Sequence, residues 1–492
     1  MLGDEIDTIL SNPKACYAVF KAHDARFDGR LFIGVTSTGI YCRPVCKVRM
    51  PNEANCSFHI SAAAAEAAGF RPCLKCRPEL APGLSRVDSP GRLARKVATM
   101  IDSDYLSDGS LHGLAESLGI TDRHLRRVFA GEFGVSPVQY LQTKRLLLAK
   151  CLLTDTSLSI ADVAFTAGFG SLRRFNDLFK TYYRMTPTLL RKQGATCSQS
   201  QRESITVLMG YRPPFRWDAL LSFFKQSLIP GVEDVRGGAY FRTLAIKHGN
   251  ALCKGWISVE NHAAQHALGV TLALPLLPAL PRILASVRRM FDLDCDPQEI
   301  FSTLSGMNQI RPGACVPGTR LPGCFSPYEL AIRLLLKQAV PRFVSTLGET
   351  VETPFATLTR LFPEPEALAG FAEKNIGHKN ALPIVTLAKS LAAGSIDLSP
   401  FSDFETELPK LQAGAILGQP AIQQLAMCAY GWPDVLPHDD PAIAGFMQML
   451  PDRQSDAWME RWLPWRSYVA ANLWACTDVL PTEHHVLKPP DV

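Results

Sequence analysis

Four cysteines in two close pairs are the residues of this sequence best suited to chemistry. The pairs read Cys42-x-x-x-Cys46 and Cys73-x-x-Cys76, with a polar loop between them. Two such pairs suit a tetrahedral thiolate site for zinc. Basic residues surround both pairs, namely Arg43, Lys47, Arg49, Arg71, Lys75 and Arg77. Thiolates inside this basic collar favour a metal-activated nucleophile that faces a polyanion; the alternative is a closed zinc knot without chemistry.

The residues around the cysteines predict a small domain that positions them. Short apolar runs between Ala18 and Val35, broken by the Asp28-Gly29 turn, predict a small sheet with the cysteines on its loops. Residues Ser61 to Gly69 predict an alanine-rich helix with Ser61 as its cap. A domain of about 80 residues has a thin core, so zinc would supply much of its folding free energy.

The pattern continues beyond the cysteines as Thr38-Gly39-Ile40-Tyr41-Cys42-Arg43-Pro44-x-Cys46 and Ala68-Gly69-Phe70-Arg71-Pro72-Cys73-x-x-Cys76. This stretch resembles the N-terminal domain of the bacterial adaptive-response (Ada) proteins. The resemblance implies that Cys42 accepts a methyl group from a methylated DNA phosphate, and that Cys46, Cys73 and Cys76 are spectator ligands. It also implies phosphate contacts by Thr38, Arg49 and Arg71. Methylation removes one negative charge from the thiolate cluster, so DNA affinity should rise.

Two copies of a helix-turn-helix pattern follow. In the first, an amphipathic helix over 111–118 ends at Gly119, and Thr121 caps the next helix. The second copy reads Ala164-x-x-Ala167-Gly168-Phe169-x-Ser171-x-x-x-Phe175. The pair resembles the AraC-type DNA-binding domain. That resemblance implies major-groove contacts by Arg123, His124, Arg126, Arg127, Arg173, Arg174 and Asn176. The alternative is that these side chains only cover solvated helix faces.

From Ile205 onward the pattern changes to strands and then to helices. Apolar runs over 207–211, 238–246 and 268–274 predict an antiparallel sheet, and the pattern is helical from about Asp296. This part resembles the AlkA branch of the helix-hairpin-helix DNA glycosylases from about residue 204 to 482. The motifs that carry the resemblance are Tyr211-x-Pro213-Pro214-Phe215-x-Trp217, Arg320-Leu321-Pro322-Gly323-Cys324, Pro437-His438-Asp439-Asp440 and Trp462-x-Pro464-Trp465-Arg466-Ser467-Tyr468.

The glycosylase resemblance implies that Asp440 is the catalytic aspartate. A carboxylate near the sugar stabilises the positive charge that builds up when the bond to an alkylated purine breaks. The resemblance also implies a phosphate contact at Gly418 and stacking on a flipped base by Trp465, Tyr468 and Trp474. Two alternatives stand beside these roles. Asp440 before a proline is a good helix N-cap, and the aromatic residues are equally suited to the core.

Several positions depart from the glycosylase pattern. Ile416 stands where the hairpin usually has its first Gly, and a β-branched residue tolerates positive φ poorly, so the turn must be reshaped. Pro420 stands where the family often has Trp. Ala339 is too small to wedge between bases, and Pro341 is expected to kink its helix. These changes favour a weakened, altered or lost glycosylase activity.

Length, charge and cysteine usage limit the number of domains, the position of a nucleic-acid surface and the compartment. A chain of 492 residues, 47% of them hydrophobic, predicts three or four folded domains. Residues 1–200 hold 26 Lys and Arg against 18 Asp and Glu, a net +8, which leaves −3 of the total +5 for the rest. The basic part is the expected nucleic-acid surface. Scattered further cysteines, an N-terminus without a signal peptide and the proline-broken apolar segment 267–280 favour the cytoplasm and no membrane.

We therefore expect a multidomain α+β protein. Its predicted parts are a small zinc-bound α/β domain (1–82), an all-α double helix-turn-helix domain (90–193), an antiparallel β-rich domain (204–295) and an all-α helix-hairpin-helix glycosylase domain (296–482).

The predicted function joins repair of alkylated DNA to regulation of the adaptive response. It comprises stoichiometric methyl transfer to Cys42, transcription activation with double-stranded DNA and RNA polymerase as partners, and excision of alkylated purines through Asp440. The alternative is a methylation-sensing regulator whose glycosylase-like half binds DNA without efficient catalysis. The Pro-Cys-His-Arg motif of O6-alkylguanine transferases is absent, so repair at guanine O6 is not expected.

Overall fold

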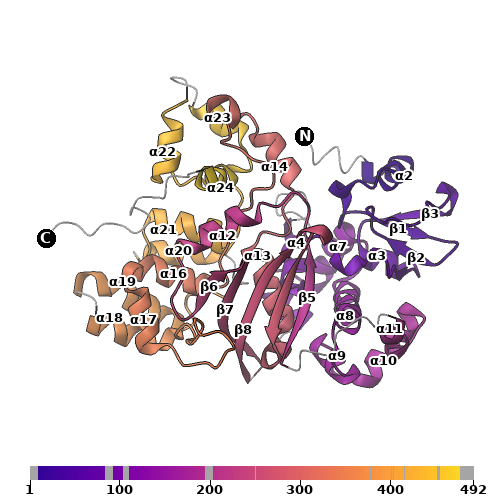
Figure 1. Ribbon diagram of the computed structural model, residues 1–492, viewed down its shortest axis with the longest axis horizontal. Coiled ribbons are helices and arrows are strands. Elements are labelled where there is room, and N and C mark those ends of the chain that lie inside the picture. The colour runs from indigo at the N-terminus through magenta and orange to yellow at the C-terminus, as the bar shows by residue number, and fades with distance from the viewer. Residues whose placement is uncertain are drawn as a thin grey trace.

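The computed structural model describes residues 9–83, 92–102, 110–193, 203–249, 251–375, 378–399, 402, 404–414, 416–450 and 455–476. We call 9–83 the N-terminal segment, the described residues of 92–193 the second segment, and those of 203–476 the C-terminal segment. Turn-forming residues predict linkers at 81–91 and 194–202; all of these residues except 81–83 lie outside the described residues. The larger sheet has five strands. In Figure 1 it occupies the middle; the first two segments lie mainly to its right, α16 to α21 to its left, and α22 to α24 above it.

The N-terminal segment contains the predicted small sheet. Its strands run in the order β3-β1-β2-β4, and all pairs are antiparallel except β2 with β4. The elements are α2 (Pro13–Lys21), β1 (Phe32–Val35), β2 (Ile40–Cys42), β3 (Cys56–His59), α3 (Ala62–Ala67) and β4 (Arg71–Pro72). The predicted cap is confirmed, since the Ser61 hydroxyl accepts from the Ala64 N–H. The prediction of a sheet from Ala18 is wrong at its start, because Ala18 to Lys21 complete α2, whose N-cap is Asn12.

The second segment is all-helical, as predicted. Its helices are α4 (Arg92–Asp102), α6 (Leu111–Ser117), α7 (Asp122–Phe133), α8 (Pro137–Asp155), α9 (Ile160–Thr166), α10 (Leu172–Tyr183) and α11 (Pro187–Gln193). The turns between the paired helices use Gly119 at φ +66° and Gly168 at φ +84°. Side chains rarely adopt this left-handed conformation, so glycine is favoured at both positions. Ser136 and Gln139 form a capping box at the start of α8.

The C-terminal segment begins with the antiparallel sheet that the apolar runs predict. Strand order is β5-β9-β8-β7-β6. The strands are β5 (Ser204–Gly210), β6 (Glu233–Arg236), β7 (Ala239–His248), β8 (Ala251–His262) and β9 (Ala267–Ala273), accompanied by α12 (Trp217–Lys225) and α13 (Leu280–Met290). The apolar segment 267–280 is therefore a buried strand followed by the 3-10 turn η5 (Leu274–Ala279).

Helices form the rest of the C-terminal segment, starting at the Asp296 cap of α14. They are α14 (Pro297–Leu304), α15 (Met307–Ile310), α16 (Pro327–Leu336), α17 (Val340–Leu347), α18 (Leu368–Asn375), α19 (His378–Ala392), α20 (Phe404–Ala413), α21 (Gln419–Gln424), the π-helical turn η8 (Leu425–Ala429), α22 (Pro441–Met447), α23 (Ser455–Arg461) and α24 (Arg466–Cys476). The helix break expected from Pro341 is present and lies four residues earlier, at Lys337, whose carbonyl would clash with the ring of Pro341 in a continuous helix. The helix already ends at Leu336, Lys337 adopts φ +49°, and Pro341 lies in the first turn of a new helix.

The segments pack directly on one another. Buried side chains of α8, α9 and α10 belong to the same hydrophobic cluster as those of β5, β8 and β9. The N-terminal segment contacts α8 through buried polar groups: Lys150 binds Glu79 at 2.5 Å and Thr143 donates to Glu66 at 2.8 Å. Within the part of the chain described, no helix has the length and apolar character needed to cross a membrane.

Candidate thiolate site, DNA-reading helices and glycosylase site

The four predicted zinc ligands come together in the N-terminal segment. The Sγ atoms of Cys42, Cys46, Cys73 and Cys76 all lie within 4.8 Å of one another. The parallel pairing of β2 with β4 brings the first and second cysteine pairs together, and the Cys73 N–H donates to the Tyr41 carbonyl at 3.0 Å. Cys42, Cys46 and Cys73 are buried, and Cys76 is partly exposed. This is a closed set of four sulfur donors.

The chemistry of these donors fits one zinc ion. Hydrogen bonds with neighbouring thiols, first that of Cys46, raise the pKa of Cys42, while the bond with Cys42 lowers the pKa of Cys73. Four thiols that share protons so closely present the arrangement in which a divalent cation replaces those protons. The residues present therefore fit the zinc that their spacing predicts.

The basic collar is only partly turned outward. The Arg43 guanidinium donates to both Asp28 carboxylate oxygens and, at 3.1 Å, to the Cys76 carbonyl. Arg77 binds Asp155 of α8 at 2.5 Å. These two arginines hold the fold together, because their charges already have carboxylate partners, buried for Asp28 and partly buried for Asp155. The exposed members of the collar are Lys47, Arg49 and Lys75.

Two of the three predicted phosphate contacts lie together. Thr38 is exposed, and the carbonyl of its neighbour Gly39 accepts from the Arg71 N–H at 2.9 Å. Arg71 is half-buried where the N-terminal segment meets α11, beside Tyr183 and Leu190. Arg49 is exposed on the loop after Cys46.

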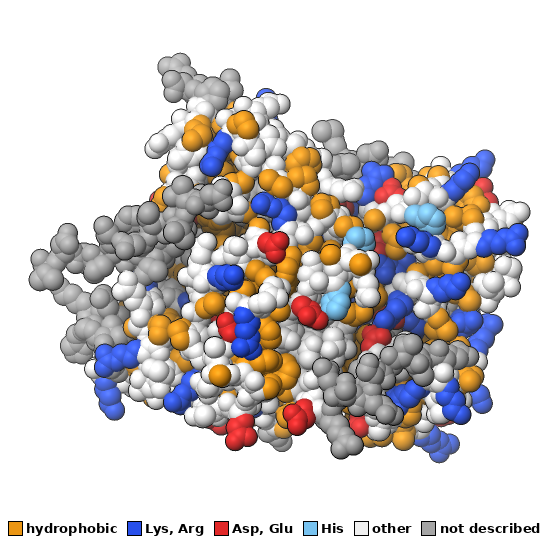
Figure 2. Space-filling model, viewed as in Figure 1, with side chains coloured by type: hydrophobic (Ala, Val, Ile, Leu, Met, Phe, Trp, Pro, Cys, Tyr) orange, Lys and Arg blue, Asp and Glu red, His pale blue; other side chains and the backbone are white. Residues whose placement is uncertain are grey.

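The predicted DNA-reading side chains lie on the second helix of each helix-turn-helix unit. On α7, Leu125 and Phe129 are buried, whereas the basic residues on its other face are half or fully exposed: Arg123, His124, Arg126 and Arg127. On α10, Phe175 and Phe179 are buried, Arg173 and Arg174 are exposed, and Asn176 is half-exposed. Figure 2 shows Lys and Arg spread over the right-hand part of the molecule, where Figure 1 places these first two segments.

Asp440 caps α22 and meets an aromatic side chain. Its Oδ1 accepts from the Ala442 and Ile443 N–H groups at 2.9 and 3.3 Å. Its Oδ2 accepts from the Trp474 indole N–H at 3.0 Å. The side chain is 9% exposed, whereas its neighbour Asp439 is exposed. The cap reading is therefore correct, and it fixes the carboxylate in one orientation beside an aromatic ring.

Phe223 is a site residue that the sequence did not indicate. It lies on α12, its ring centroid is 5.6 Å from that of Trp474, and both rings are half-exposed. A half-exposed aromatic pair beside a buried carboxylate can stack on a planar ring. No local signal separates Phe223 from its neighbour Phe224, which is buried. Only the packing of α12 against α24 identifies it.

Two predicted stacking residues need correction. Trp465 is 2% exposed and Tyr468 is 4% exposed, so core packing covers both rings. The Tyr468 hydroxyl donates to Asp292 at 2.8 Å, and burial raises the pKa of this phenol above its ordinary value. These two residues hold α24 in place. Trp474 is the predicted aromatic residue that borders Asp440.

The motif from Trp462 to Tyr468 also holds the loop that leads to Asp440. Arg466 forms a bidentate ion pair with Asp434 at 2.5 and 2.8 Å. The fully buried Ser467 hydroxyl accepts from the Val435 N–H at 3.0 Å and lies 2.7 Å from the Trp432 carbonyl. The motif therefore fixes residues 432–435, a few positions before the carboxylate.

In the hairpin, Ile416 replaces the usual Gly without adopting positive φ, the conformation that a β-branched residue tolerates poorly. Ile416 is 3% exposed and is not among the described residues with positive φ. Gly418 is exposed and has φ −72°, and it precedes α21 without a side-chain cap. Pro420 is in the first turn of that helix. Ala415 lies outside the described residues.

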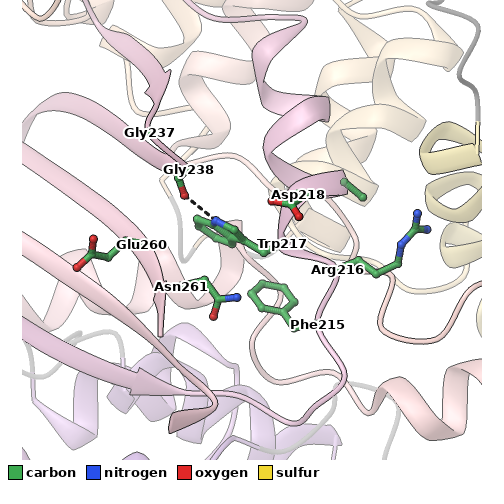
Figure 3. Close-up of a pocket in the computed structure, with 9 residues that line it drawn as sticks. Phe215, Arg216, Trp217, Asp218, Gly237, Gly238, Glu260 and Asn261 are labelled. Carbon is green, nitrogen blue, oxygen red and sulfur yellow. Dashed lines mark hydrogen bonds between the residues drawn. The ribbon is translucent and has the colours of Figure 1, made fainter. Parts of the chain in front are cut away.

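A groove of about 540 Å³ opens elsewhere, beside the start of α12 (Figure 3). In Figure 3 the indole of Trp217 donates to the Gly238 carbonyl, Glu260 points away from it, and Arg216 extends toward the opposite side. Neither the four thiols nor Asp440 line this groove. Its charged side chains diverge, so they do not form a reactive centre.

Comparison with known proteins matches three family models along the chain. They are the metal binding domain of Ada over residues 15–79, a helix-turn-helix domain over 114–193 and the AlkA N-terminal domain over 206–326.

Three curated relatives cover different shares of the chain. The probable bifunctional transcriptional activator/DNA repair enzyme AlkA of Mycobacterium tuberculosis is 33% identical over 486 residues, which is 94% of this chain and 96% of the relative. DNA-3-methyladenine glycosylase 2 of Escherichia coli is 29% identical, and the match covers 56% of this chain and 99% of the relative. The bifunctional activator and repair enzyme AdaA of Bacillus subtilis is 32% identical, over 35% of this chain and 78% of its own.

Proposed function

This chain belongs to the family of bifunctional transcriptional activators and DNA repair enzymes that includes the AlkA protein of Mycobacterium tuberculosis, and we propose that its parts divide this work by residue as follows. The zinc-binding part spans 1–82, the DNA-reading part 90–193, the β-rich part 204–295 and the glycosylase part 296–482. The observation that carries the proposal is the cluster of four Sγ atoms within 4.8 Å, in the same chain as the Asp440 site.

Cys42 is the methyl acceptor. Its thiolate attacks the methyl carbon of a DNA methylphosphotriester, the carbon–oxygen bond breaks, and the phosphodiester leaves with the electron pair as an anion. Cys46, Cys73 and Cys76 hold the site, and bound zinc supplies the positive charge that keeps four thiols deprotonated. Thr38, Arg49 and Arg71 contact the phosphates. The product is a thioether, so each chain reacts once.

The second segment binds promoter DNA. Its exposed side chains on α7 and α10 read successive major grooves: Arg123, His124, Arg126, Arg127, Arg173, Arg174 and Asn176. Loss of one negative charge at the cluster on methylation lowers the repulsion between this part of the protein and DNA. RNA polymerase is the partner that an activator of this kind recruits, and the cytoplasm is the compartment.

Asp440 performs the base excision. Its carboxylate stabilises the positive charge that develops on the sugar as an alkylated purine leaves, and orients the water that replaces the base. Trp474 and Phe223 stack on the flipped purine, and Gly418 contacts a phosphate. The Asp440 carboxylate is held both by the N–H groups that it caps and by the Trp474 indole. This fixed orientation supports catalysis over DNA binding alone.

The test is to find the methyl group. Zinc-loaded protein is incubated with duplex DNA containing methylphosphotriesters, digested and mapped by mass spectrometry. We expect one methyl group on Cys42 and none in the Cys42→Ser variant. The matched control is Cys56→Ser, which removes a half-exposed thiol of the same segment outside the cluster and should leave the transfer unchanged. An unmodified Cys42 would refute the acceptor role.

A further inference from the structure

Buried charges line the contact between the N-terminal and C-terminal segments. Arg30, Asp28, Arg212 and Asp296 are each no more than 4% exposed. Arg212 donates to the Asp28 carbonyl at 2.8 Å and to the Asp294 carbonyl at 3.0 Å. Arg30 pairs with Asp296 at 3.4 Å. Charges are buried only where their partners are held in place, so this contact is a specific interface.

The two segments also approach too closely for any side chain to lie between them. A Cβ on Gly210 of β5 would lie 1.9 Å from the Leu80 carbonyl oxygen. A second contact fixes the same stretch, because the Gly83 N–H donates to the Asp294 carboxylate at 2.9 Å. Residues 80–83, which leave the zinc-binding part, therefore lie directly on the C-terminal segment.

On the N-terminal side, the interface reaches the thiolate loops. Asp28, whose carbonyl Arg212 holds, binds the Arg43 guanidinium with its carboxylate. Arg43 follows Cys42 and donates to the Cys76 carbonyl at 3.1 Å. Its own N–H lies 3.4 Å from the Cys76 Sγ. The loops that carry the four cysteines thus set the position of Asp28.

On the C-terminal side, the same contacts continue toward the Asp440 site. Arg320 donates to the Arg212 carbonyl and, at 3.2 Å, to the Asp292 carbonyl. The Asp292 carboxylate accepts from the Tyr468 hydroxyl at 2.8 Å. Tyr468 lies on α24, the helix that carries Trp474. Polar contacts therefore connect the cysteine loops with the helix beside Asp440.

We propose that the zinc site and the C-terminal segment are thermodynamically linked through Arg212, so that zinc bound by the four cysteines stabilises the glycosylase half. A ligand stabilises whatever unfolds together with its site, and the buried interface makes the two segments unfold together. Independence is a genuine alternative, because the glycosylase of Escherichia coli matches 56% of this chain over 99% of its own length. The linkage is a property of this chain's interface and is separate from methyl transfer and base excision.

The distribution of tryptophan makes the linkage measurable in the intact protein. All seven tryptophans lie in the C-terminal segment, namely Trp217, Trp256, Trp432, Trp458, Trp462, Trp465 and Trp474. Tryptophan fluorescence therefore follows unfolding of the glycosylase half only. We expect removal of zinc by a chelator, verified by metal analysis, to lower the tryptophan-reported unfolding midpoint of the full chain by about 4 °C or more.

Arg212→Met and Arg30→Met break the interface from its two sides. Each should reduce the zinc-dependent shift to about 1 °C or less. Arg242→Met is the matched control: Arg242 is equally buried, but its partners Glu329 and Glu233 both belong to the C-terminal segment. It should lower the midpoint and keep the zinc-dependent shift.

Two results would overturn the linkage. One is a wild-type midpoint that does not change when zinc is removed. The other is a zinc-dependent midpoint shift that persists in both interface variants, since the two segments would then be coupled through α8 and not through Arg212. Should Arg212→Met fail to fold, the wild type and Arg30→Met still decide the question. Neither readout depends on methyl transfer or base release, so the proposed function can fail while the linkage holds.

Discussion

The indole N–H of Trp474 donates to the Asp440 carboxylate at 3.0 Å, while the other carboxylate oxygen caps α22. Both oxygens are thus engaged in fixed directions. The carboxylate is oriented before any substrate arrives, which is the preorganisation that stabilisation of a developing cation requires. This relationship joins two elements, α22 and α24, on which the proposed excision chemistry depends.

Asp440→Asn should abolish most base release. The amide keeps a helix-capping oxygen but has no negative charge to stabilise the sugar cation. We expect release of 3-methyladenine from alkylated duplex DNA to fall about a hundredfold or more in single-turnover assays. Asp439→Asn, at the exposed neighbouring carboxylate, should retain the wild-type rate. Equal rates in wild type and Asp440→Asn would instead favour a glycosylase-like half that only binds DNA.

Trp474→Phe separates the hydrogen bond from the stacking surface. Phenylalanine keeps a ring opposite Phe223 but cannot donate to Asp440. A hydrogen bond to a charged group contributes roughly 1.5–3 kcal/mol, so the excision rate should fall about tenfold or more. Trp256→Phe, which alters an indole on β8 away from this site, should leave the rate unchanged. A normal rate in Trp474→Phe would show that the indole N–H is dispensable.

Glu66 should make stability depend on pH between its unfolded pKa of 4.5 and its folded pKa of about 8. Burial raises its pKa from an ordinary 4.5 to about 8, against hydrogen bonds from Thr143 and Tyr41 that lower it. The folded state therefore keeps a proton that the unfolded state releases between these values, and stability falls as pH rises through this window.

Glu66→Gln removes this titration. We expect the urea midpoint of the zinc-loaded variant to change less between about pH 6 and about pH 8 than that of the wild type, with the variant favoured at the higher pH. Glu116→Gln replaces an exposed carboxylate and should keep the wild-type pH dependence. A wild type with no such dependence would contradict the buried, protonated state.

Arg173 and Arg174 should contribute charge to DNA binding without contributing to the fold. Both are exposed on α10. Replacing them with Ala should weaken duplex binding and reduce the slope of log affinity against log salt by about 0.9 for each phosphate that is no longer neutralised. Fluorescence anisotropy across a salt series measures this slope. The control Arg342→Ala removes an exposed arginine from the C-terminal segment, and an equal loss there would show that any surface charge suffices.

Local patterns were sufficient to predict much of this protein. Cysteine spacing identified the four thiols, hydroxyl and carboxylate caps identified helix starts at Ser61, Thr121 and Asp440, and alternating apolar runs identified the large sheet. These features succeed because their causes act between residues that are close in sequence: a cap bonds to N–H groups two or three positions ahead, and paired cysteines lie on one turn.

Only the tertiary structure decided which side chains meet across segments. Arg43 belongs to a basic run, yet its charge is neutralised by Asp28, and Tyr468 belongs to an aromatic motif, yet it is buried against Asp292. Phe223 is joined to Trp474 from a helix about 250 positions earlier in the chain. Such pairings depend on how whole elements pack, and residue type does not specify them. The sequence by itself determined the reactive groups, and the packing of segments determined which of them face a substrate.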